Sequence, residues 1–260
     1  MTLTYTKYLK VDKLLNMQQT RSKPEEHDET LFIIIHQTYE LWFKQILHEF
    51  DLLRKELEAG HTWNSIKTFR RILVILKTVV GQTDILETMT PLSFNHFRGY
   101  LENASGFQST QFREIETLCG LHYPEKLDYL DEDTKLNKRL KKRFKERTLW
   151  ESFCLFLSKK SYQIEKPKRV NDSGFIFEPS EKNQEILVHI MKNDHEIALL
   201  SELFVDFDEG LQEWRYRHVK MVERTIGTKV GTGGSDGVDY LKSTLHQMIF
   251  PDLWAIRTKL

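Results

Sequence analysis

Cysteine, glycine and proline are scarce in this chain of 260 residues, and each shortage argues against a class of fold or site. The two cysteines, Cys119 and Cys154, stand far apart without a CxxC spacing, so neither a disulfide framework nor a thiolate metal site is indicated. Twelve glycines and six prolines are few for a sandwich or barrel with many turns. The composition therefore favours long helices.

Net charge and long apolar runs are also absent. The 38 basic residues balance 38 acidic ones, so the overall charge draws the chain neither to nucleic acid nor to an anionic membrane. The first ten residues lack the apolar core of a signal peptide, and no uncharged run approaches the roughly 18 residues of a membrane span. We expect a cytoplasmic, soluble protein that binds neither nucleic acid nor membrane.

Aromatic residues, by contrast, make up 12% of the chain, and many fall on one face of a predicted long helix. Between Leu31 and Leu57, apolar residues recur at helical three-and-four spacing: Phe32, Ile35, Tyr39, Trp42, Ile46, Phe50, Leu53 and Leu57. His36 lies one turn from Phe32 on this face. An imidazole on an apolar wall needs a hydrogen-bond partner, or it faces a ligand.

The boundaries of this helix are also predicted from the sequence. Asp28 and Thr30 are candidate N-caps, and Gly60 follows the last apolar position. The run 33–35 consists of isoleucine and alone favours a strand, but the periodicity that continues beyond it overrides this propensity.

The remaining pattern predicts an all-α chain without internal repeats. Residues 1–30 form a polar arm with a few apolar positions, expected to dock on something else, and residues 31–260 form a helical bundle with a small helical insertion. Further helices are predicted up to Gly81, after Pro91, up to Gly120 and from Glu185 onward.

Residues 121–182 are more polar and charged than the rest, and we expect a helical segment there. The strongly basic stretch 135–147 fits either a face that binds RNA or membrane, or the solvated outer face of an amphipathic helix. The neutral chain and the acidic residues beside this stretch favour the solvated face. Residues 165–180 contain two prolines and an Asn-Asp-Ser-Gly turn, which predicts a loop.

A second histidine, His218, occupies a position like that of His36, between Trp214 and Val222 on a helical apolar stripe. Each histidine alone fits a hydrogen-bonded core residue. Two of them on separate long helices of an aromatic-rich bundle could instead face each other across a flat cofactor, as a haem with one axial histidine requires.

Two further features leave alternatives open. The segment 231–237 superficially matches GxGxxG but follows a helix rather than a strand, so it is either a flexible connector or a loop that brings backbone and Thr232 close to a ligand. Arg98 shares a helix with Phe94 and Phe97. It pairs either with an internal carboxylate or with the carboxylate of a substrate.

Several motifs closely resemble the tryptophan 2,3-dioxygenase family. They are His36–Trp42, Phe97–Arg98 followed by Ala104–Ser109, Trp214–His218, and Gly231–Ser235, in the order and spacing of the family. The resemblance runs from Tyr5 to the C-terminus. It implies haem b, a homotetramer of helical subunits, and the conversion of L-tryptophan and O2 to N-formyl-L-kynurenine, the first step of tryptophan breakdown through kynurenine.

The resemblance also assigns residues around the cofactor. His218 matches the proximal ligand of the haem iron, and His36 the distal histidine that faces the indole N–H. Indole N–H is a very weak acid, so we expect His36 to position the substrate by a hydrogen bond rather than to act as a base. Ser105 and Gly106 match a turn that lies near the haem, and Phe32 matches a wall of the pocket.

Around the substrate, Arg98 matches the residue that binds the carboxylate, and Thr232 the residue that contacts the amino-acid end. Phe94 lies where relatives have tyrosine or phenylalanine. One departure is Asp236, which replaces an expected serine after the Gly-rich motif; it could alter loop closure or the binding of the negatively charged substrate end, and we expect it to point to solvent.

The arm residues Tyr5, Tyr8 and Leu9 match a segment that, in the family, closes the site of a neighbouring subunit. This implication gives a partner to an apolar arm that has nothing local to pack on. The alternatives to the dioxygenase are a relative that oxygenates another indole or aromatic amino acid, and a haem- or tryptophan-binding protein without turnover.

Overall fold

The computed structural model describes the chain except residues 1, 122–133, 170–176, 228, 230–237 and 246. Its described part is helical, with one isolated β-bridge between Arg169 and Phe177, so the predicted all-α class is confirmed. None of the helices in this part is long and apolar enough to cross a membrane.

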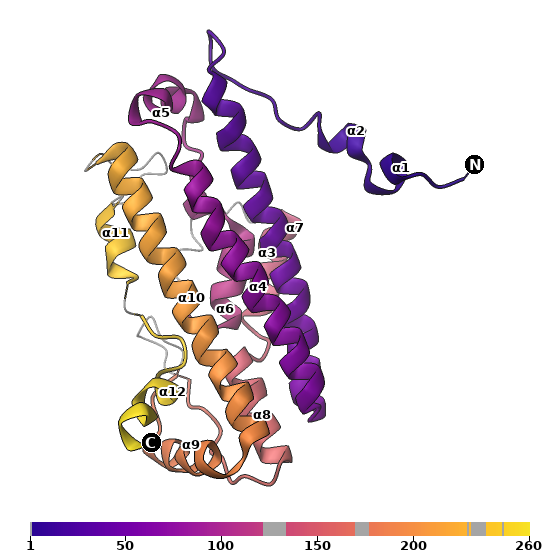
Figure 1. Ribbon diagram of the computed structural model, residues 1–260, viewed down its shortest axis with the longest axis vertical. Helices are drawn as coiled ribbons and strands as arrows, with labels where there is room; N and C mark the ends of the chain where they lie inside the picture. Colours follow the sequence, from indigo (N-terminus) through magenta and orange to yellow (C-terminus); the bar gives the residue numbers. More distant parts are fainter. Residues whose placement is uncertain (1, 122–133, 170–176, 228, 230–237, 246) are drawn as a thin grey trace.

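Three long helices form the frame of the molecule and lie side by side in Figure 1. They are α3 (His27–Ala59), α4 (Thr62–Leu86) and α10 (His195–Ile226). Their apolar stripes meet around Phe207 of α10, whose ring centroid lies 5.5 Å from that of Phe50 and 6.0 Å from that of Phe69. Gly210 permits the close approach of α4, because a Cβ there would lie 2.9 Å from Leu76 Cδ2.

Shorter elements cover this frame. Next along the chain are α5 (Pro91–Arg98), the 3-10 turns η1 (Gly99–Leu101) and η2 (Gly106–Gln108), α6 (Thr110–Leu118), α7 (Lys135–Arg143), α8 (Leu149–Lys159), α9 (Glu181–Asn193), α11 (Val238–Ser243), α12 (Pro251–Ala255) and η4 (Ile256–Lys259). Helix α8 lies inside the range expected to be polar, yet it is apolar and buries Trp150, Phe153 and Phe156 in the core.

Two predicted helix boundaries are wrong and one is confirmed. Helix α3 begins at His27, so Asp28 lies in its first turn and caps nothing. It ends at Ala59, and Gly60 follows as predicted, in the left-handed conformation with φ of 82°. Gly81 does not end α4, which continues to Leu86. The cost of an interior glycine, about 1 kcal/mol, is outweighed by the buried residues on both sides of it.

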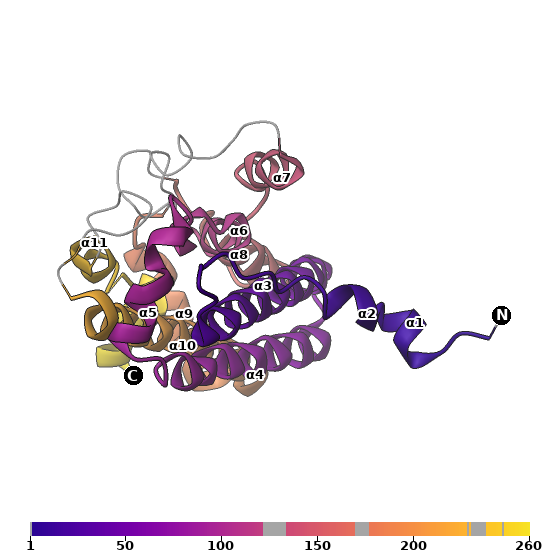
Figure 2. The same cartoon turned by 90° about the horizontal axis from the view of Figure 1, so that it is seen from above.

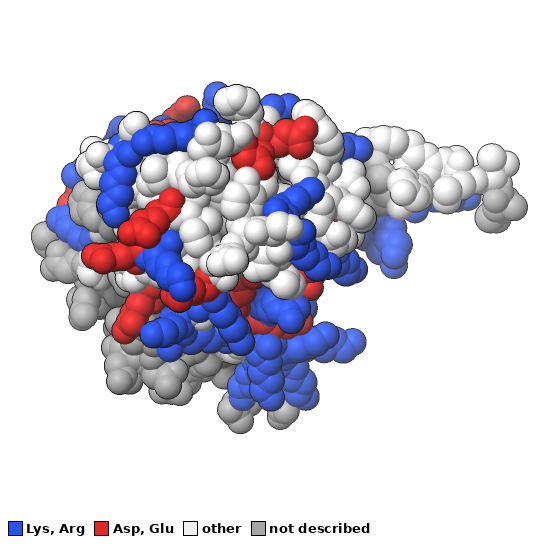
Figure 3. All heavy atoms as spheres, turned by 90° about the horizontal axis from the view of Figure 1, so that it is seen from below, with Lys and Arg blue, Asp and Glu red and all other residues white. Residues whose placement is uncertain are grey.

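The N-terminal arm carries α1 (Tyr5–Leu9) and α2 (Val11–Leu14) and projects away from the body (Figures 1 and 2). Its attachment is polar: the buried carboxylate of Glu29 accepts hydrogen bonds from the backbone of Arg21 and Ser22. Beyond that attachment the surface of the arm is mostly uncharged (Figure 3). Helix α3 already begins at His27, so the last four residues of the predicted arm, 27–30, belong to this helix.

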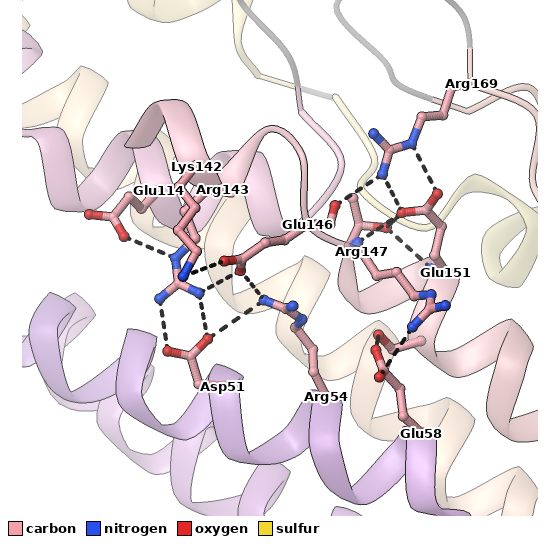
Figure 4. A network of polar contacts seen from close by, with 12 residues as sticks. Asp51, Arg54, Glu58, Glu114, Lys142, Arg143, Glu146, Arg147, Glu151 and Arg169 are labelled. Carbon is pink, nitrogen blue, oxygen red and sulfur yellow. Dashed lines mark hydrogen bonds and ion pairs between the residues drawn. The ribbon is translucent and has the colours of Figure 1, made fainter. Parts of the chain in front are cut away.

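The basic helix α7 lies on the outer side of α6 (Figure 2) and is fixed by ion pairs. Arg143 is buried and donates to Glu114 at 3.1 Å, Asp51 at 2.5 Å and Glu146 at 2.8 Å (Figure 4). Burial alone would lower the pKa of Arg143, but its hydrogen bonds to the three carboxylates and the charge of Asp51 outweigh burial and raise it. The prediction of a solvated face is therefore wrong for Arg143, which the structure uses to attach α7 to α3 and α6.

The C-terminal segment is held by one buried carboxylate. Asp208 of α10 accepts hydrogen bonds from the backbone N–H groups of Ile249 and Phe250 at 2.7 and 3.0 Å, and from Trp254 Nε1 at 2.9 Å. Because a buried carboxylate needs such donors, the contact fixes α12 against α10.

Candidate active site

A cavity of about 280 Å³ opens between α3, α5, α6, α10 and α11. The pattern of apolar and polar side chains around it is typical of a small-molecule site. Of the residues predicted for the site, the cavity is lined by His36, His218, Phe32, Phe94, Arg98, Ser105 and Gly106. These residues come from four separate regions of the sequence, so the fold brings the predicted motifs to one place.

His36 lies on α3, and its environment fixes which ring nitrogen carries the proton. Its Nδ1 lies 2.7 Å from the carbonyl oxygen of Phe32, which can only accept a hydrogen bond. Nδ1 therefore carries the hydrogen, and neutral His36 presents the lone pair of Nε2 as an acceptor. Burial lowers the pKa of His36, and it outweighs the opposing effects of the Phe32 carbonyl and the Glu40 charge. The ring is neutral at neutral pH.

His218 lies on α10 and is stacked on Trp214, with ring centroids 5.2 Å apart and planes 5° from parallel. Burial, then the charges of His36 and Arg113, lowers its pKa to about 4. Within the described part of the chain no residue forms a hydrogen bond with the His218 ring. A neutral imidazole without a protein partner at the edge of a cavity retains a lone pair for a ligand.

An aromatic wall closes the cavity beside His36. The ring centroid of Phe32 lies 4.1 Å from that of His36, 5.7 Å from that of Phe94 and 5.5 Å from that of Phe97. Phe94 and Phe97 come from α5, whose first turn is capped by the Thr90 side chain and begins with Pro91. This wall can hold a flat apolar ring beside the acceptor of His36.

Polar groups lie at the end of α5 and in the turn after it. Arg98 is the last residue of α5, is half-buried and lines the cavity. Ser105 begins η2 through a capping box with Gln108, which fixes the backbone of Ser105 and Gly106 along the cavity.

Some predicted residues are not brought to the cavity. Thr232 and Asp236 lie outside the described residues. Tyr5, Tyr8 and Leu9 are exposed on the projecting arm and do not line the cavity of their own chain.

The prediction missed polar residues that line the cavity. Glu40 lies one turn after His36, and both its carbonyl oxygen and its Oε2 accept from Gln111 Nε2 at 2.8 Å. Arg113, Glu116 and Arg215 also line the cavity and form ion pairs with one another. The signal for Glu40 was its spacing from His36. The other three were marked only by charges next to apolar helix positions, a pattern shared by many surface residues.

The donor set fits a haem. The cavity places two neutral imidazoles on facing helices, and an aromatic wall lies beside one of them. In the described part of the chain, no cluster of three or more His, Cys, Asp or Glu side chains could hold a bare metal ion. A metal that is itself carried by a flat organic ligand needs only one protein ligand, and His218 can provide it.

Comparisons with known proteins agree with this geometry. The family model described as tryptophan 2,3-dioxygenase matches residues 1–159 and 181–260. A tryptophan 2,3-dioxygenase from Herpetosiphon aurantiacus is 53% identical over 258 residues, which cover 99% of this chain and 98% of that protein. One from Anaeromyxobacter dehalogenans is 48% identical over 98% of this chain and 95% of its own length, and one from a Nocardioides species is 41% identical over 99% and 95%.

The match omits only residues 160–180, the segment between α8 and α9, and covers every element that lines the cavity. The chain belongs to the tryptophan 2,3-dioxygenase family.

Proposed function

We propose that this chain catalyses the reaction named by its relatives, the cleavage of the indole C2–C3 bond of L-tryptophan by O2 to give N-formyl-L-kynurenine. Both oxygen atoms enter the product, so turnover consumes no external reductant. The observation that carries the proposal is the pairing, across one cavity, of a hydrogen-bond acceptor on His36 with an imidazole on His218 that has no described partner.

His218 is proposed to hold the iron of haem b, one per subunit. The neutral ring supplies a lone pair to the metal, and the low pKa of His218 keeps that lone pair free at neutral pH. When bound, the ferrous haem supplies the activation of O2. Ser105 and Gly106 lie along the same cavity and are proposed to pack against the haem.

The substrate is proposed to lie against Phe32 and Phe94, with its indole N–H donating to His36 Nε2. The proton stays on the indole nitrogen at this stage, because neutral imidazole is far too weak a base to remove it. His36 thus aims the C2–C3 edge of the ring. Positioning of this kind lowers the entropic part of the barrier.

Arg98 is proposed to bind the substrate carboxylate, and Thr232 to contact the amino-acid end. A guanidinium binds a carboxylate in a fixed bidentate geometry, so it fixes direction as well as charge. Arg98 lies next to Phe97 on α5, which places the charged end near the aromatic wall. An analogue without the carboxylate should bind poorly, because Arg98 would then face an incomplete site.

A homotetramer is proposed, in which the arm completes the site of a neighbour. Tyr5 and Tyr8 are 76% and 70% exposed, and large aromatic side chains exposed together on a surface mark a site of interaction. A chain that lacks residues 2–14 should keep its helical circular dichroism and its haem but lose affinity for tryptophan. If tryptophan affinity is unchanged in that chain, the role of the arm in the site is wrong.

The central test is direct. The protein is loaded with haem and reduced, L-tryptophan and air are added, and the products are separated. N-Formyl-L-kynurenine supports the proposal; a different oxygenated product favours a relative with another substrate. A haem Soret band without any product indicates a binding protein. Arg98→Ala should retain haem and lose tryptophan affinity, whereas His218→Ala should fail to retain haem.

A further inference from the structure

A cluster of three charges in the wall of the cavity is not balanced. Glu116 of α6 accepts from Arg113 through Oε2, and its Oε1 lies 3.3 Å from Arg215 Nη2. All three side chains are buried or nearly so, with exposed fractions of 4%, 12% and 4% for Glu116, Arg113 and Arg215. Across the described chain no second carboxylate lies within ion-pair distance of either arginine. Two guanidinium groups therefore share one negative charge.

Both terminal nitrogens of Arg215 donate to described residues of the protein, whereas only one terminal nitrogen of Arg113 does. Arg215 donates to the carbonyl oxygen of Thr244 at 3.1 Å as well as to Glu116. Arg113 uses Nη1 for Glu116, its Nε is buried without a hydrogen-bond partner, and none of the described residues accepts from its Nη2. The guanidinium of Arg113 thus has donors left over inside a largely buried site.

The surroundings of Arg113 favour an anionic, planar-edged ligand group. Its guanidinium carbon lies 5.2 Å from the ring centroid of Phe107 and 5.3 Å from that of Phe112. Both rings pack against the guanidinium, and the side chain of Arg113 lines the cavity. An excess positive charge with spare donors next to a cavity is matched by a carboxylate, which a guanidinium binds in bidentate fashion.

We propose that Arg113 binds one propionate carboxylate of the haem, and that Glu116 and Arg215 hold it in position. The inference rests on haem as the cofactor. The alternative source of a carboxylate is the substrate, but the proposed substrate position lies by Arg98 and the phenylalanine wall of α5. Arg113 lies on the side of His218, because its guanidinium packs on Phe112, whose ring centroid is 4.7 Å from that of Trp214, the residue that stacks on His218.

The test separates charge from packing by comparing haem b with its dimethyl ester, which has the same ring but no propionate charge. Each is loaded into the full-length protein, and its loss to excess apomyoglobin is followed by Soret absorbance. Arg113→Gln should speed the loss of haem on the order of ten- to a hundredfold. The loss of the dimethyl ester should change by less than about threefold, because no charged contact is removed there. Arg113→Lys should restore part of the difference.

The variants are chosen to fold. In Arg113→Gln the buried Glu116 keeps Arg215 as its partner, so no carboxylate is left unpaired. Arg139→Gln is the matched control, because Arg139 pairs with buried Glu114, which keeps Arg143 as its partner, and Arg139 does not line the cavity. This variant should leave both rates unchanged.

Three outcomes overturn the inference. If Arg113→Gln speeds the loss of haem and of its dimethyl ester equally, Arg113 only packs against the ring. If the variant speeds neither loss, Arg113 contacts neither ligand. Unchanged haem loss with weaker binding of L-tryptophan, but not of tryptamine, assigns Arg113 to the substrate carboxylate. If the unaltered protein shows no Soret band or forms no N-formyl-L-kynurenine, the proposed function fails instead.

Discussion

Removal of the His36 imidazole, tested with two substrates, gives the sharpest prediction about the proposed reaction. The variant is His36→Ala, and the substrates are L-tryptophan and 1-methyl-L-tryptophan, in which a methyl group replaces the indole N–H. The two changes remove the two partners of one proposed hydrogen bond. Together they form a cycle that isolates the interaction from the other effects of each change.

The magnitude follows from the contacts of the ring. The Phe32 carbonyl, 2.7 Å from Nδ1, leaves Nε2 as the acceptor, and no described residue donates to it. Loss of His36 should leave the indole N–H of bound tryptophan unpaired in a buried site, at a cost of about 1–3 kcal/mol. The value of kcat/KM for L-tryptophan should therefore fall on the order of 5- to 150-fold. For the methylated substrate, which has no N–H, the fall should stay within about threefold.

The assay is the initial rate of product formation, at several substrate concentrations, with protein whose haem content is fixed from the Soret band. His61→Ala serves as the control, because His61 is exposed and pairs with Glu56 outside the cavity. An equal fall of kcat/KM for both substrates would refute the reasoning, since His36 would then act through something other than the indole N–H. A fall in haem content alone would assign His36 to the cofactor.

Further predictions concern the structure around the site. Arg143→Ala should lower the free energy of unfolding in urea by about 2–3 kcal/mol. The loss is smaller than for a fully unpaired buried charge, because Glu114 and Glu146 keep Arg139 and Arg54 as partners. The control Lys182→Ala, which breaks an exposed ion pair, should cost about 0.5 kcal/mol or less. Burial raises the pKa of Asp51 and Glu146, but hydrogen bonds from arginine outweigh it and lower both values. The two carboxylates therefore contribute fully to the free energy of unfolding above the unfolded-state pKa of about 4, and this contribution is lost as the pH falls further. At a pH below about 4 the urea concentration at the unfolding midpoint should decrease, and it should decrease by less in Arg143→Ala. Asp208→Ala removes the acceptor of two buried backbone N–H groups and of the partly buried Trp254 Nε1. It should cost about 3 kcal/mol or more and speed hydrogen exchange of the backbone N–H groups of Ile249 and Phe250.

The fold class was predictable because the helical periodicity is long. The isoleucine run 33–35 would form a strand if its local propensity decided, yet it lies inside a 33-residue helix. Periodicity over about seven turns reports which face is buried, and burial outweighs a propensity difference of a few tenths of a kcal/mol per residue. The same reasoning explains the error at Gly81. One residue with poor propensity does not end a helix whose neighbours Val79, Val80 and Leu86 are buried.

Burial in the bundle was predictable for the two histidines but not for the buried arginines. His36 and His218 stand on apolar stripes, and a polar residue on such a stripe is conspicuous. Arg143 and Arg113 stand in sequences typical of an ordinary charged helix surface. Arg113 pairs with Glu116 of its own helix, but Arg143 is buried against Asp51 and Glu114, which come from other helices. Asp51 is 92 residues away from Arg143. Pairings at that separation leave no periodic trace in the sequence.

The chemical role of His36 depends on a feature that the sequence does not contain. A histidine on a buried stripe could present either ring nitrogen to a ligand, as donor or acceptor, and these choices imply different reactions. The Phe32 carbonyl, one helical turn before it, decides between them because a carbonyl only accepts. Any histidine in a helix can turn toward this carbonyl, but burial is what makes the contact matter, since it lowers the pKa and keeps the second nitrogen unprotonated. The polarity of the site thus arises from local backbone geometry combined with desolvation by the surrounding bundle.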